Sequence, residues 1–214
     1  MSKCASGCSP FKLDLLESSV RGLQVLDLGA GTLQYSRWIK ERFGDVLVTA
    51  VDMIDQKSPA NLKYVRANLE DPLALESEQF STVVAFDVIE HIEDEAGIVS
   101  EIMRLLASGG VLIGSVPHDD DGFLPEYNLT FYHRSDLSHK RYYTVQSVTN
   151  LLKDAGFSGV VVTPAGGIPP HVFAEFLPEL FRWPMKKVIG ICLRLGLLND
   201  NRLKSDLFFV AYKK

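Results

Sequence analysis

Residues 25–37, with the sequence VLDLGAGTLQYSR, join an apolar run, two closely spaced glycines and the start of a helical pattern. This order predicts a strand, a tight turn through Gly29, Ala30 and Gly31, and a helix. Because glycine has no Cβ, the turn can take unusual φ/ψ values and let a ligand approach its backbone. The helix N-terminus then offers N–H groups to an electron-rich ligand atom. Asp27, at the end of the strand, can accept hydrogen bonds from a ligand ammonium or from the loop.

A second acidic residue ends the next apolar run, LVTAVD, a little over twenty residues beyond the turn. In a strand–helix–strand unit Asp52 lies at the carboxyl end of the second strand, beside the glycine turn. There its carboxylate can accept both ribose hydroxyls of a nucleoside. Met53, which follows it, could lie against an adenine face. The alternative is an aspartate that only caps the next turn.

The turn resembles motif I of the class I S-adenosylmethionine (SAM)-dependent methyltransferases, D-x-G-x-G-x-G, through Asp27, Gly29 and Gly31. The sequence departs from that motif at Leu33, which places a bulky side chain beside the expected methionine end of SAM. A dinucleotide site is disfavoured, because the third glycine of its G-x-G-x-x-G fingerprint is replaced here by Gln34.

Residues 87–91, DVIEH, are a second resemblance, to motif IV of the small-molecule methyltransferases of ubiquinone and menaquinone biosynthesis. The resemblance implies that Asp87 and Val88 belong to the cofactor site. It also implies that Asn68, with Leu69 beside it, takes the place of the residue that binds the adenine amino group. The run differs from the proline-containing motif of nucleic-acid amino-methyltransferases.

Alternating apolar strands and amphipathic helices predict an α/β fold with a mostly parallel sheet. The resemblance implies a single Rossmann-like domain over 1–214, with a seven-stranded sheet in the order 3-2-1-4-5-7-6, an antiparallel last strand and helices on both faces. The expected strands are 24–28, 47–52, 62–68, 80–87, 110–117, 159–163 and 206–213, and the expected helices are 11–20, 33–43, 94–106 and 144–155.

The loop 118–143 follows the fifth strand at the ligand-binding edge of the sheet and is rich in histidine, acidic and aromatic residues. We therefore interpret it as the acceptor side of the site. A base is needed only if the acceptor loses a proton, and the candidates are His118, His133 and His139. Acidic residues next to His118 are more typical of a solvated turn, so no metal is predicted.

The segment 166–205 is an insertion before the last strand, rich in proline and apolar residues. We expect it to be a helical cap, with a basic amphipathic helix over 186–194. It could cover an apolar acceptor, pack on its own domain or on a second subunit, or rest on a membrane surface. An apolar lid suits a lipid or quinone precursor, whereas the polar loop 118–143 suits a sugar.

The totals fit a cytoplasmic α/β protein. The net charge is −5 with no long basic run, which argues against a nucleic-acid partner. No apolar stretch is long enough to cross a bilayer, and residues 1–22 are expected to be a tail, with no signal peptide, followed by a helix. Cys4 and Cys8 are expected to be free thiols. A monomer or a homodimer is equally consistent with the sequence.

The resemblance implies in-line transfer of the SAM methyl group to a small-molecule acceptor. The protein then has mainly to align donor and acceptor in a dry pocket. Two alternatives stay open. The first is a non-catalytic SAM-binding subunit, and the second is a nucleotide-dependent oxidoreductase on a similar fold.

Overall fold

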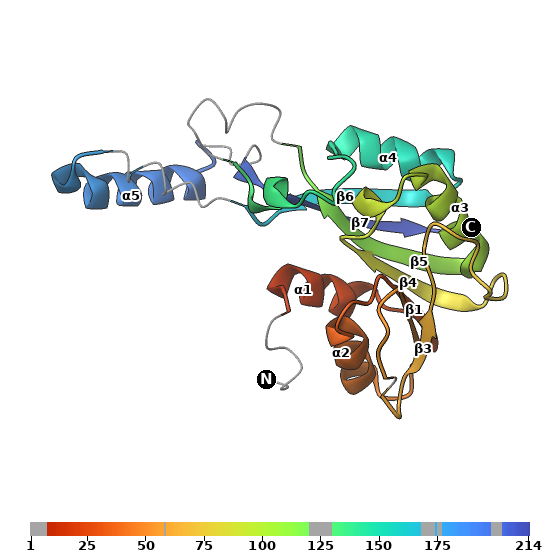
Figure 1. The fold of residues 1–214 in the computed structure, drawn as a ribbon. Helices are drawn as coiled ribbons and strands as arrows, with labels where there is room; N and C mark the ends of the chain where they lie inside the picture. Colours follow the sequence, from red (N-terminus) through yellow and green to blue (C-terminus); the bar gives the residue numbers. More distant parts are fainter. Residues whose placement is uncertain (1–7, 58, 120–129, 168–173, 175–176, 198–202) are drawn as a thin grey trace.

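Seven strands form one sheet with helices on both faces (Figure 1). The structure, a computed structural model, describes residues 8–57, 59–119, 130–167, 174, 177–197 and 203–214. The strands are β1 (Gln24–Leu28), β2 (Leu47–Asp52), β3 (Lys63–Arg66), β4 (Phe80–Phe86), β5 (Leu106–Pro117), β6 (Ser158–Ala165) and β7 (Asp206–Tyr212). The helices are α1 (Pro10–Ser19), α2 (Gln34–Phe43), α3 (Glu95–Leu105), α4 (Val145–Asp154) and α5 (Glu179–Arg194), with short 3₁₀ helices η2 (Ile89–His91) and η4 (Tyr132–Ser135).

The strand order is β3-β2-β1-β4-β5-β7-β6, which confirms the predicted order. The first five strands are parallel, and β7 runs antiparallel to both of its neighbours. Parallel strands place their carboxyl ends at one edge of the sheet. The residues that end or follow these strands therefore lie at the same edge, although they are far apart in the sequence. Gly29 follows β1, Asp52 ends β2 and Asp87 follows β4.

The two faces of the sheet are covered by different helices. Along β4, Val83 and Ala85 join the core beneath α3 and α4, whereas Val84 and Phe86 join the core beneath α1 and α2. Because successive side chains of a strand point to opposite faces, a strand covered on both sides must be apolar throughout. The apolar run from Val83 to Phe86 in β4 has this explanation.

Local signals predicted most of the helix ends. Thr144 caps α4, where its hydroxyl accepts a hydrogen bond from the backbone of Ser147, and Gly44 ends α2 with a φ of 57°. Two boundaries differ from the prediction by more than two residues, and the others agree to within two. The strand β5 begins at Leu106, before the glycine pair, and α5 begins at Glu179 and runs through Pro184. Pro184 lies in the second turn of α5, where it has no N–H to donate to the carbonyl of Leu180, so the helix lacks one hydrogen bond there.

The helix α5 extends away from the sheet rather than covering it (Figure 1). None of its residues is buried. Within the described ranges, every helix is too short or too polar to cross a membrane.

Candidate active site

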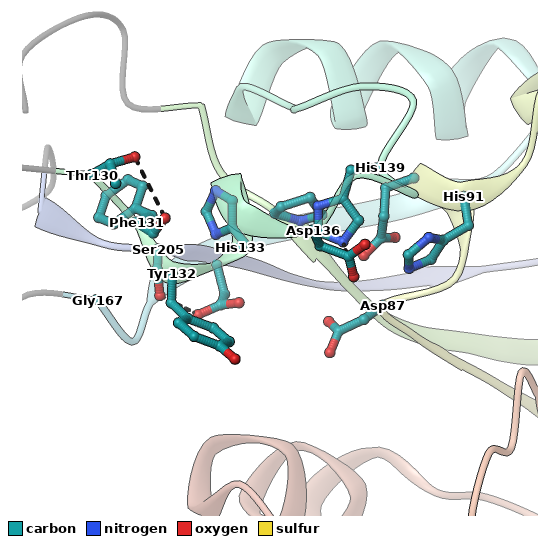
Figure 2. A pocket seen from close by; sticks show the side chains of 13 residues that line it. Asp87, His91, Thr130, Phe131, Tyr132, His133, Asp136, His139, Gly167 and Ser205 are labelled. Atoms are coloured by element: carbon teal, nitrogen blue, oxygen red, sulfur yellow. Dashed lines mark hydrogen bonds and ion pairs between the residues drawn. The ribbon is translucent and has the colours of Figure 1, made fainter. Parts of the chain in front are cut away.

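Two cavities lie at the carboxyl edge of the sheet and share the side chains of Asp87 and His91. The histidine cavity, about 600 Å³, is lined by Asp87, Glu90, His91, Pro117, Thr130, Phe131, Tyr132, His133, Asp136, His139, Gly167, Ser205 and Asp206 (Figure 2). The turn cavity, about 230 Å³, is lined by Gly29, Asp52, Met53, Ala67, Asn68, Leu69, Asp87, Val88, His91 and Ile92. Asp87 and His91 mark where the two cavities meet.

The turn cavity gathers most of the residues that the sequence predicts for a cofactor. Gly29, Asp52, Met53, Asn68, Leu69, Asp87 and Val88 all line it, from the ends of four strands. Asp27, Ala30 and Gly31 are not among its lining residues.

Backbone geometry explains both glycines of the turn. Gly29 has a φ of +62°, and a Cβ on it would lie 2.5 Å from Cγ2 of Val88. Gly31 has a φ of +48°, but no atom lies within 4 Å of where its Cβ would be. Gly29 is therefore required by close packing, whereas Gly31 borders open space beside the turn.

Asp52 ties the turn to the end of β2. Its Oδ2 accepts a hydrogen bond from the N–H of Gly31 at 2.7 Å, and its Oδ1 accepts one from the N–H of Ile54 at 3.0 Å. Each carboxylate oxygen has a second lone pair, so both can still accept a ligand hydroxyl. Asn68 lies two residues beyond β3, and its Oδ1 accepts a hydrogen bond from the N–H of Glu70 at 3.2 Å.

Asp27 is a buried link between β1 and α2. Its side chain accepts a hydrogen bond from the hydroxyl of Ser36, and the residue is 3% exposed. Burial raises the pKa of its carboxyl to about 6, against the lowering effect of the Ser36 hydrogen bonds. The sequence predicted a ligand or the loop as the hydrogen-bond partner of Asp27. In the structure its partner is instead Ser36, in the helix that follows the turn.

Leu33 adopts the backbone conformation of the glycine that it replaces. Its φ is 62°, in the left-handed region, and its N–H donates to the carbonyl of Ala30 at 2.8 Å. The side chain is fully buried against Ala30 and Ala50. It lines neither cavity. The expected bulk beside the ligand is therefore directed into the core.

Asp87 stands at the junction of the cavities with a φ of 54° and a side chain that is 46% exposed. Its carboxylate forms an ion pair with Lys12 of α1 and accepts a hydrogen bond from the hydroxyl of Ser115. The ammonium of Lys12 also lies 5.2 Å from the centre of the Phe86 ring. Lys12 thus holds the Asp87 carboxylate from the side of α1, although no residue of this helix is among those that line either cavity. Sequence reasoning missed Lys12 because a single helical lysine carries no signal.

His139 and His133 both line the histidine cavity, as the sequence predicts for the acceptor side. Nε2 of His139 lies 3.6 Å from Oδ2 of Asp136, and its Nδ1 is buried with no hydrogen-bond partner in the described part of the chain. Burial, followed by the nearby His91, lowers the pKa of His139. His139 is therefore a neutral imidazole near pH 7 and can accept a proton.

His118 differs from the other two candidates. Its Nδ1 donates a hydrogen bond to the carbonyl of Lys204 at 2.8 Å, and its backbone N–H donates to the carbonyl of Ser205 at 2.8 Å. It is not among the residues that line either cavity. The structure gives His118 the role of joining the end of β5 to the segment that leads into β7.

Glu90 is a site residue that sequence reasoning passed over. It is 1% exposed, lines the histidine cavity, and its Oε2 has no hydrogen-bond partner among the described residues. Burial, and then the charge of Asp87, raise the pKa of its carboxyl to about 8. The ligand atoms of Glu90, His91 and His139 lie within 4.8 Å of one another, a donor set that could hold a divalent cation. The sequence predicted no metal.

Comparison with known proteins points to one family. Residues 4–162 match the family model described as "Methyltransferase domain". The ubiquinone biosynthesis O-methyltransferase of Psychrobacter arcticus is 28% identical over 160 residues, which are 66% of this chain and 62% of that protein. The chain thus spans less than two thirds of that relative.

Two further comparisons agree with this match. The ubiquinone biosynthesis O-methyltransferase of Neisseria meningitidis is 24% identical, over 78% of this chain and 76% of that protein. The crystal structure of an S-adenosylmethionine-dependent methyltransferase from Mesorhizobium loti aligns with a TM-score of 0.65 and 20% identity, over 97% of this chain and 99% of that one. The last similarity shows the shared fold.

Proposed function

Because the chain belongs to the methyltransferase-domain family, we propose that it transfers a methyl group from SAM to a hydroxyl of a small aromatic acceptor. The observation that carries this proposal is the meeting of two cavities at Asp87 and His91. One cavity suits a nucleoside and the other an aromatic molecule. Group transfer requires two ligands to meet at one point, and the shared residues provide such a point.

The residues of the turn cavity fit the nucleoside of SAM. Asp52 offers two carboxylate oxygens to the ribose hydroxyls, and Asn68 and Leu69 would border the adenine. The open space beside Gly31 leaves room for a ligand against the turn. When bound, SAM supplies an electrophilic methyl group on a positively charged sulfur. The carboxylate of Asp87 would stabilise positive charge at the junction.

The histidine cavity supports an aromatic acceptor. Phe131, Tyr132, His133 and His139 supply four flat rings around its wall. Flat rings favour stacked or edge contacts with another ring. The names of the Psychrobacter and Neisseria relatives also support a quinone precursor with a ring hydroxyl.

Methylation of a hydroxyl releases one proton, and His139 is the residue that we assign to accept it. The carboxylate of Asp136, 3.6 Å from Nε2, favours the tautomer with the hydrogen on Nε2, so the proton goes to Nδ1 and the resulting imidazolium pairs with Asp136 through Nε2. Because burial lowers the pKa of His139, the imidazole is in its basic form near neutral pH. The new oxygen–carbon bond replaces the carbon–sulfur bond, whose electron pair stays on sulfur.

Activity of the His139→Ala variant tests this role. General-base catalysis is typically worth about 10²- to 10⁴-fold, so we expect kcat to fall within that range while the affinity for SAM is unchanged. His118→Ala is the matched control, because His118 lines neither cavity, and it should keep most of its activity. A His139→Ala enzyme with more than a tenth of the original kcat would contradict the assignment.

Isothermal titration with SAM, S-adenosylhomocysteine and NADH separates the proposal from its alternatives. Binding of the two adenosyl ligands alone supports the methyltransferase. Tight SAM binding without methyl transfer to any hydroxylated aromatic acceptor would instead support a non-catalytic SAM-binding subunit. Tighter binding of NADH than of SAM would support an oxidoreductase.

A further inference from the structure

The helix α5 leaves its apolar side open to solvent. It projects from the end of the molecule where β6 and β7 approach the insertion (Figure 1). Phe181, Met185, Val188 and Ile191 are 56%, 38%, 51% and 55% exposed. Burial normally covers the apolar stripe of a helix, so such a row of open side chains marks an interaction site.

These side chains share one face of the helix. At 100° per residue, Phe181, Met185, Val188, Ile191 and Cys192 fall within one arc of about 120°. The residues that are only half exposed fall mostly on another side of α5: Arg182, Lys186, Ile189, Gly190 and Leu193. The four large apolar side chains of the arc are nevertheless open to solvent, and Leu180, which is 80% exposed, extends the arc by about 20° at one edge.

Basic residues flank the apolar arc of α5: at 100° per residue, Lys187 lies about 40° from one edge, and Arg194 and Arg182 lie about 60° from the two edges. The helix carries four basic residues, Arg182, Lys186, Lys187 and Arg194, and one acidic residue, Glu179. Its net charge is therefore +3, in a chain whose net charge is −5. A positive helix on an otherwise negative protein is attracted locally to a negative surface that would repel the rest of the molecule.

We propose that α5 docks the protein on an anionic membrane surface, with its apolar arc in the boundary between lipid headgroups and acyl chains. An open apolar face, basic residues beside it and modest overall hydrophobicity are the features of helices that lie in such a boundary. The charge disfavours a second copy of the same helix as the occupant, because two helices of net charge +3 would repel each other.

Docking would bring the histidine cavity close to the lipid. Gly167 and Ser205, from the two ends of the segment that carries α5, both line that cavity. An acceptor dissolved in the membrane could then reach the cavity without crossing water. This consequence rests on the proposed function, whereas the docking itself does not.

Vesicle flotation with the full-length protein tests the proposal. We expect the protein to float with vesicles that contain phosphatidylglycerol in phosphatidylcholine, and to float much less with phosphatidylcholine alone. Each basic residue near an anionic surface adds about fivefold to the partition coefficient, so Lys187→Ala should lower it by about that factor, and 0.5 M salt by more.

Val188→Glu should lower the partition coefficient at least tenfold, because it places a charge in the apolar arc. Leu23→Glu is the matched control, since Leu23 is 62% exposed at the start of β1, at the opposite edge of the sheet from the cavities. Equal flotation of Val188→Glu and Leu23→Glu, or no flotation of the wild type with anionic vesicles, would overturn the proposal. So would concentration-dependent dimerisation that Val188→Glu abolishes, because α5 would then bind a second copy. SAM titration of the same variants reports separately on the proposed function.

Discussion

Replacing Glu90 by glutamine should flatten the pH dependence of the protein's stability. In the folded protein burial raises the pKa of the Glu90 carboxyl from its ordinary value of 4.5 to about 8. In the unfolded chain the same carboxyl ionises near pH 4.5. At any pH between 4.5 and 8, Glu90 is therefore mostly protonated in the folded protein and mostly ionised in the unfolded chain. Its contribution to the free energy of unfolding is fully present below pH 4.5 and is lost as the pH rises to 8.

The size of this effect follows from the two pKa values. One pKa unit corresponds to about 1.4 kcal/mol, so the wild type should lose about 3 kcal/mol of stability through Glu90 between pH 5 and pH 8. Glutamine does not titrate, so this loss disappears in the variant. An imperfectly satisfied amide costs about 1–3 kcal/mol at every pH, so the slope, rather than the absolute stability, is the informative quantity.

Urea unfolding at pH 5, 6, 7 and 8 measures that slope. The difference in free energy of unfolding between Glu90→Gln and the wild type should grow with pH, in favour of the variant. Glu76→Gln is the matched control, because Glu76 is exposed, and it should track the wild type. The charge of Asp87 is the second cause, after burial, of the raised pKa of Glu90. Asp87→Asn should therefore reduce in part the slope of unfolding free energy against pH. Parallel profiles for Glu90→Gln and the wild type from pH 5 to pH 8 would refute the reasoning.

Two further substitutions test the glycine turn. Asp52→Asn should weaken SAM binding by about 1.5–3 kcal/mol, roughly 10- to 150-fold, because it removes a charged acceptor while keeping the side chain's shape beside the Gly31 N–H. Isothermal titration measures this, and Asp55→Asn, at a side chain that is 84% exposed, is the control; equal affinities would remove Asp52 from the ribose site. Leu33→Gly relieves about 1 kcal/mol of left-handed strain but removes a fully buried side chain worth about 2–5 kcal/mol. We expect a net destabilisation of about 1–4 kcal/mol by urea unfolding, and a more stable variant would show that strain outweighs packing.

Local patterns in the sequence determined the sheet and its glycine turn. Apolar runs that end in Asp52 and precede Asp87 could only be buried strands, and parallel strands bring their carboxyl ends to one edge. The gathering of most of the predicted residues around the turn cavity was therefore predictable from their positions in the chain. Thr144 and Gly44 likewise marked helix ends through hydrogen bonding and φ values that involve only their near neighbours.

Tertiary packing decided the features that depend on residues far apart in the sequence. The carboxyl of Glu90 is polar by type, and its burial in the fold, followed by the nearby charge of Asp87, raises its pKa. Lys12 pairs with Asp87 because α1 crosses the carboxyl edge of the sheet, and Leu33 could turn inward because Ala30 and Ala50 leave space in the core. His118, His133 and His139 looked equivalent as candidate bases, and the fold separated them by placing two on a cavity wall and one against Lys204. Burial and long-range distances are properties of the packed chain, so residue type and spacing alone do not fix them.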